Sequence, residues 1–196
     1  MSRLPAITLR EATSAQRAIF DAVTGGERAR RHTPNTFIDA RGGLAGPFNA
    51  WAHRPDLGDS VLPLGAQLRF RGELPGGARE IAILVVGATW KAEFEWWAHA
   101  EIARQEGVPE ETLTAILNGE TPSLSDPVEQ AAYDVAKALL KTGKVDDKTY
   151  QNARELVGDG GLVELVTLVG YYTLVSFILN AFEVPLPEGE TGVFAA

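Results

Sequence analysis

The chain contains no cysteine, and this absence removes a whole class of chemistry. Without thiols the protein forms no disulfide bond, no thiolate metal site and no redox-active dithiol. Thiol peroxidase chemistry is therefore excluded. Any catalytic site in this chain has to be built from carboxylates, imidazoles, hydroxyl groups or amines.

Positive charge is also scarce. The sequence has 18 Lys and Arg against 26 Asp and Glu, which gives a formal net charge of −8. Surfaces that bind nucleic acids show clustered Lys and Arg, so we expect no nucleic-acid partner. An anionic small molecule would need a local cation to hold it, and Arg69 and Arg79 are near in sequence to the acidic and imidazole groups considered below.

There is one long apolar run, at residues 162–182, and it approaches the length of a membrane span. Five polar side chains interrupt this run, and no cationic flank follows it: Glu164, Thr167, Thr173, Ser176 and Asn180. We interpret the run as a buried helix that is partly shared between subunits, not as a membrane helix. The N-terminal residues do not resemble a targeting peptide, so we expect a cytoplasmic protein without a membrane partner.

Helix signals recur along the whole chain and predict an all-α, single-domain helical bundle spanning residues 1–196, with a core at about residues 8–188. Thr8 is predicted to cap a first helix that reaches Val23, and Thr89 to cap another that reaches about Glu106. Residues 25–47 are predicted to form a long loop rich in Gly, Arg and Pro. Residues 81–86 and 162–169 are rich in β-branched side chains, but no hairpin turns bound them, so helices are favoured.

Two acidic residues and one histidine have the spacing of an acid–base site. Glu95 and His99 are one helical turn apart and share a face with Ala92, while Glu80 lies on the preceding predicted helix. An imidazole between two carboxylates can move protons near neutral pH.

Each of these residues also has a structural interpretation. His99 could simply pair with Glu95 on a helix surface, and Glu80 could be a first-turn acid favoured by the helix dipole. Trp96 is more typical of a core or interface than of a substrate wall. The spacing alone leaves both interpretations open.

Four segments carry a family resemblance: Arg79-Glu80, Glu95-Trp96-Trp97-Ala98-His99, Gly46–Pro55 upstream and Pro185-Leu186-Pro187 downstream. Together they resemble the carboxymuconolactone decarboxylase family. That family has an all-helical fold of the alkyl hydroperoxidase D type. Glu80 and His99 fall on the glutamate and histidine positions of the peroxidase branch, while Ala92 and Glu95 occupy its two cysteine positions. The resemblance therefore implies a cysteine-less member that works by proton transfer.

The resemblance implies a cofactor-free, metal-free lyase that decarboxylates a small cyclic, lactone-type carboxylate, with His99, Glu80 and Glu95 as catalytic residues. Two alternatives stay open: an isomerase or hydrolase acting on a lactone in the same pocket, or a non-catalytic oligomeric binding protein. We assign substrate binding to six further residues: Arg69, Arg79, His53, Trp96, Trp51 and Asn180. The family resemblance and the apolar run together predict a homo-oligomer, a trimer or a hexamer.

Overall fold

The computed structural model describes residues 2–25 and 37–194, and eight helices lie in these ranges. No strand forms in them beyond two isolated bridges, Thr8 with Gly43 and Ile38 with Leu44. The all-α prediction is confirmed. Part of the predicted loop, residues 26–36, lies outside the described residues.

The chain folds as two compact units, and the single-domain organisation stays a prediction. The first unit comprises residues 1–72 and 178–191, and the second comprises residues 73–177 and 192–196. The boundary at residue 178 falls within the last helix.

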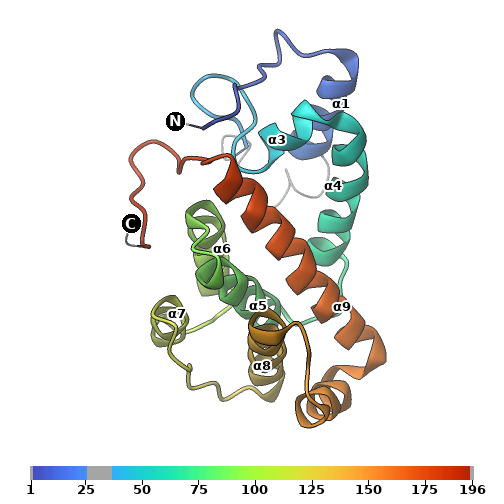
Figure 1. The fold of residues 1–196 in the computed structure, drawn as a ribbon, viewed down its shortest axis with the longest axis vertical. Helices are drawn as coiled ribbons and strands as arrows, with labels where there is room; N and C mark the ends of the chain where they lie inside the picture. Colours follow the sequence, from blue (N-terminus) through green and yellow to red (C-terminus); the bar gives the residue numbers. More distant parts are fainter. Residues whose placement is uncertain (1, 26–36, 195–196) are drawn as a thin grey trace. The chain divides into compact units, whose positions relative to one another are not determined.

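The first unit contains α1 (Ser14–Thr24), α3 (Phe48–His53) and α4 (Pro55–Phe70), which pack against one another (Figure 1). Their apolar faces enclose a small core that includes Ile19, Phe20, Val23, Trp51 and Leu62. The first helix begins later than predicted, because Thr13 and not Thr8 provides the cap. The Thr13 hydroxyl accepts from Gln16 N–H while the Gln16 side chain accepts from Thr13 N–H, a reciprocal capping box.

The second unit is organised around α5 (Gly76–Thr89), which packs against α6 (Glu93–Gln105), α7 (Glu110–Leu117) and α8 (Pro127–Thr142) (Figure 1). Residues 77–78 and 80–87 of α5 are all buried. This explains its continuous apolar sequence: a helix surrounded by other helices needs apolar side chains on every face. α8 begins at the predicted cap, where Asp126 Oδ1 accepts from Val128 N–H and Glu129 N–H.

The turn between α5 and α6 differs from the prediction. Thr89 ends α5 and donates its hydroxyl to Val85 O at 2.7 Å, so it does not cap the next helix. Lys91 then adopts a positive φ of 49°, which turns the chain sharply, and α6 begins only at Glu93. The Glu93 side chain also accepts hydrogen bonds from Val193 N–H and Phe194 N–H. These bonds hold residues 193–194 against the start of α6.

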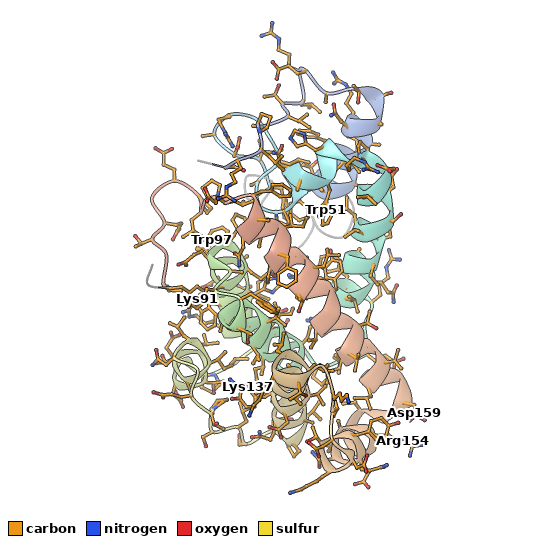
Figure 2. The ribbon with its side chains drawn as sticks, viewed as in Figure 1. Trp51, Lys91, Trp97, Lys137, Arg154 and Asp159 are labelled. Carbon is orange, nitrogen blue, oxygen red and sulfur yellow. The ribbon has the colours of Figure 1, made fainter. Side chains whose placement is uncertain are left out.

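The last helix, α9 (Asp147–Ala181), is interrupted at Gly158, where φ is 70° and ψ is 176°. Arg154 Nε lies 2.5 Å from Asp159 Oδ1, so an exposed ion pair spans the interruption (Figure 2). By length and composition α9 is the one helix in the described ranges that could cross a membrane, and 44% of its most apolar window is buried within the protein. Core helices of soluble proteins meet the same criterion, so the observation is weak evidence for a membrane span.

One polar interruption of α9 has a clear structural role. The Glu164 carboxylate accepts from Glu73 N–H at 2.7 Å and from Leu74 N–H at 3.4 Å. These amides precede α5. Glu164 therefore fixes the start of the helix that carries Glu80.

Candidate active site

Glu80 and His99 form a buried pair across two neighbouring helices of the second unit. Glu80 lies on α5 and is fully buried, and His99 lies on α6 and is 5% exposed. Glu80 Oε2 is 2.5 Å from His99 Nδ1. A carboxylate accepts hydrogen bonds and does not donate them, so an ionised Glu80 requires the proton on Nδ1. This contact fixes the orientation of the imidazole ring.

The second ring nitrogen faces Glu95, which is one turn earlier on the same helix and is also buried. Glu95 Oε1 is 3.0 Å from His99 Nε2, the distance of an ion pair. The same oxygen is buried and makes no directed hydrogen bond. Glu95 Oε1 therefore keeps the capacity to bond to a third group.

Arg79 supplies a positive charge next to the buried pair. Its Nε lies 3.5 Å from Glu80 Oε1, its Nη1 donates to Leu74 O at 3.4 Å, and its Nη2 lies 3.8 Å from Glu106 Oε1. Glu106 is half-exposed. Charges of alternating sign therefore run from the surface at Glu106, through Arg79, to buried Glu80, which contacts His99.

Aromatic side chains cover the imidazole and the adjoining helix. The ring of Tyr172, on α9, meets the His99 ring edge to face with centroids 5.0 Å apart. Trp96 packs against Phe194 with centroids 5.8 Å apart. Such a wall limits the access of water and strengthens electrostatic interactions inside it.

The structure brings Glu80, Glu95 and His99 together and places Arg79 against Glu80. Trp96 is buried on the helix that carries His99. The other predicted substrate-binding residues all belong to the first unit. Trp51 lies in the core, His53 Nε2 is 2.9 Å from Pro5 O, Arg69 lies over the Phe70 ring, and Asn180 is exposed near the end of α9. Their role in substrate binding stays a prediction.

Three residues of this region were not found from the sequence: Glu106, Glu164 and Tyr172. In the sequence Glu164 stands only as a break in an apolar run. The contact of Glu164 with Glu73 spans 91 residues, that of Tyr172 with His99 spans 73 and that of Glu106 with Arg79 spans 27, and no local pattern reveals them. Among the described residues, no group of three or more His, Asp or Glu is arranged to hold a metal ion.

Residues 55–138 match the model of the carboxymuconolactone decarboxylase family. The family segment includes Glu80, Glu95, His99 and Arg79, so the whole acid–base group lies inside it. No curated protein sequence matches the chain.

Solved structures with a similar fold include three proteins. A peroxidase-related protein with an alkyl hydroperoxidase AhpD core, from Ralstonia eutropha JMP134, is 18% identical with a TM-score of 0.72, covering 95% of this chain and 93% of that one. A peroxidase-related protein from Silicibacter sp. TM1040 is 13% identical with a TM-score of 0.72, covering 96% of this chain and 92% of that one. A cysteine-to-alanine variant of the debrominase Bmp8, in complex with 2,3,4-tribromopyrrole, is 13% identical with a TM-score of 0.70, covering 96% of this chain and 95% of that one. At such identities the likeness establishes the AhpD-like fold.

Proposed function

We propose that this protein is a cofactor-independent lyase that decarboxylates a small cyclic, lactone-type carboxylate by acid–base chemistry at His99, Glu80 and Glu95. The observation that carries the proposal is the arrangement of the imidazole. One nitrogen is fixed by buried Glu80, and the other lies beside Glu95 Oε1, a buried oxygen without a directed hydrogen bond. The family match over residues 55–138 and the fold support an enzymatic role but do not distinguish among reactions.

The proposed reaction breaks the bond between the ring carbon and the carboxylate, and carbon dioxide leaves. The electron pair passes through the ring double bond to the lactone carbonyl oxygen, which becomes negatively charged. His99 Nε2–H donates a hydrogen bond to this oxygen, and such donors stabilise developing charge most strongly in a dry site. Protonation of the resulting enolate at carbon completes the reaction.

Glu95 is the proposed proton donor to carbon. It is buried and lies beside Nε2, so its carboxyl group is next to any oxygen that Nε2–H binds. The reaction consumes one proton, and solvent returns it to Glu95 after the product leaves. Glu80 keeps its charge throughout and holds the imidazole in place. Arg79 balances the Glu80 charge.

A turnover assay tests the proposal. Butenolide carboxylates are incubated with the protein, and the loss of ultraviolet absorbance is followed together with carbon dioxide release. We expect His99→Ala and Glu80→Gln to lower turnover by about a hundredfold or more, the range of general acid–base catalysis. Glu101→Gln is the matched control, because Glu101 is exposed on the same helix as His99, and this variant should keep wild-type turnover.

Three results would count against the proposal. Ring opening or double-bond migration without carbon dioxide release would indicate the lactone hydrolase or isomerase. Wild-type turnover in both His99→Ala and Glu80→Gln would remove the acid–base group from the mechanism. A protein that binds these acids but converts none of them would be the non-catalytic binding protein.

A further inference from the structure

Ser176 is a fully buried polar residue whose hydroxyl has no hydrogen-bond partner in the structure. A serine or threonine inside a helix ordinarily donates to the carbonyl one turn earlier. Thr167 does so in the same helix, with its hydroxyl 2.7 Å from Val163 O. Ser176 makes no such bond. Buried polar atoms without partners are few in folded proteins, and each calls for an explanation.

Two aromatic contacts show in which direction α9 runs along α6. Tyr172 packs against His99, and Phe177 packs against Trp90, which precedes α6. From Tyr172 to Phe177 the chain therefore advances toward the start of α6. Ser176 is one turn beyond Tyr172 on the same face of α9. Glu95 is one turn before His99 on α6, so Ser176 and Glu95 lie at the same level.

Glu95 Oε1 is the second buried oxygen at this level without a directed hydrogen bond. It lies 3.0 Å from His99 Nε2, so the imidazole adjoins the same position. Two buried oxygens, one on α9 and one on α6, thus have unused bonding capacity, and the one on α6 adjoins the ring nitrogen. Leaving such oxygens unpaired inside a protein is costly, and a bound polar ligand removes that cost.

We infer that Ser176 is a substrate-binding residue, and that its hydroxyl donates to the carbonyl oxygen of a lactone ring together with His99 Nε2–H. The inference rests on the proposed function and adds a second donor to the stabilisation of the enolate oxygen. A carbonyl oxygen has two lone pairs, so it accepts from both donors at once. Glu95 then lies at the side of the ring, where it can protonate carbon.

The test uses a lactone that the enzyme cannot decarboxylate. γ-Butyrolactone labelled with carbon-13 at its carbonyl is titrated against the wild-type protein, and NMR gives the affinity and the limiting carbonyl shift. Two donors should move the carbonyl signal downfield. We expect Ser176→Ala to weaken binding by about tenfold or less and to reduce the limiting shift, the effect of losing one neutral hydrogen bond. Turnover of a decarboxylated substrate should fall by about a hundredfold, as for the loss of one oxyanion donor.

Thr112→Val provides the matched control. Thr112, on α7, is also buried with an unpartnered hydroxyl, and valine preserves its shape. This variant should bind γ-butyrolactone as the wild type does. Ser176→Ala should unfold at the wild-type temperature or above it, because alanine favours helix and removes an unpaired polar group.

The inference is overturned if the wild type gives no carbonyl shift, or if Ser176→Ala gives the wild-type shift and affinity. A clear fall in the melting temperature of Ser176→Ala also overturns it, because the hydroxyl would then have a structural partner. These results are separable from a failure of the proposed function. An enzyme that releases no carbon dioxide, yet loses its carbonyl shift in Ser176→Ala, would disprove the lyase and leave the Ser176 site standing.

Discussion

At the scale of single residues, the main electrostatic problem is the burial of Glu80 and Glu95 beside one imidazole. If both acids are ionised and His99 is protonated, the three side chains carry one net negative charge inside the protein. A buried charge without a partner is strongly destabilising. The Arg79 guanidinium, 3.5 Å from Glu80 and 12% exposed, cancels that charge. Its second contact, with Leu74 O, holds it in position.

Arg79→Ala should therefore affect the protein in two ways. We expect the free energy of unfolding to fall by up to about 3 kcal/mol, because Glu80 loses its cation. If Arg79 acts by positioning Glu80 and not by binding substrate, we also expect kcat to fall with little change in KM. Arg79→Lys should recover only part of both, since an ammonium cannot make the separate contacts of the guanidinium fork. Thermal unfolding and steady-state kinetics measure these effects.

Glu106→Gln is the control variant for Arg79→Ala and Arg79→Lys. Glu106 is half-exposed and 3.8 Å from Arg79, so its loss should cost less than about 1 kcal/mol. A large rise in KM with unchanged kcat in Arg79→Ala would contradict the positioning role and make Arg79 the substrate anchor.

At the scale of helices, the sequence was informative where local chemistry decides the structure. Asp126 and Pro127 mark the start of α8 because capping and the N1 proline act within one turn. The cap predicted at Thr89 was wrong. A threonine hydroxyl at this position can cap the following helix or donate to the preceding one, and that of Thr89 donates back to Val85 O. The pairing of Glu80 with His99 could be predicted from the family motif. The contact of Tyr172 with His99 could not, because it depends on how α9 packs against α6.

Gly158 offers a test of the interruption in α9. Its φ of 70° and ψ of 176° belong to a region that only glycine adopts readily, and a Cβ there would meet no atom within 4 Å. Gly158→Ala should thus cost about 1–3 kcal/mol through backbone strain alone. Gly170→Ala, in the regular part of the same helix with equally open space, should gain up to about 1 kcal/mol. Chemical denaturation of the two variants measures the difference, and equal stability would contradict the conformation at Gly158.

At the scale of the whole molecule, α9 has two apolar faces. One is buried and includes Leu165, Leu168 and Tyr172. The other is exposed and consists of Val163, Val166, Leu174 and Phe177, whose spacings of three, eight and three residues put them on one helical face. A row of exposed apolar side chains at this spacing is typical of helices that meet another helix. This exposed face supports the proposal of a homo-oligomer.

We therefore expect light scattering at micromolar concentration to give a mass that is a multiple of 21.1 kDa, with three or six copies as the family resemblance implies. Val163→Glu and Leu174→Glu place charges on the exposed face of α9 and should shift the mass toward the monomer, because burying an unpaired carboxylate in an interface is strongly unfavourable. Leu9→Glu, at an equally exposed leucine of the first unit, should leave the mass unchanged. A monomeric wild type would refute the oligomer, and unchanged masses in both α9 variants would place the subunit interface elsewhere on the protein.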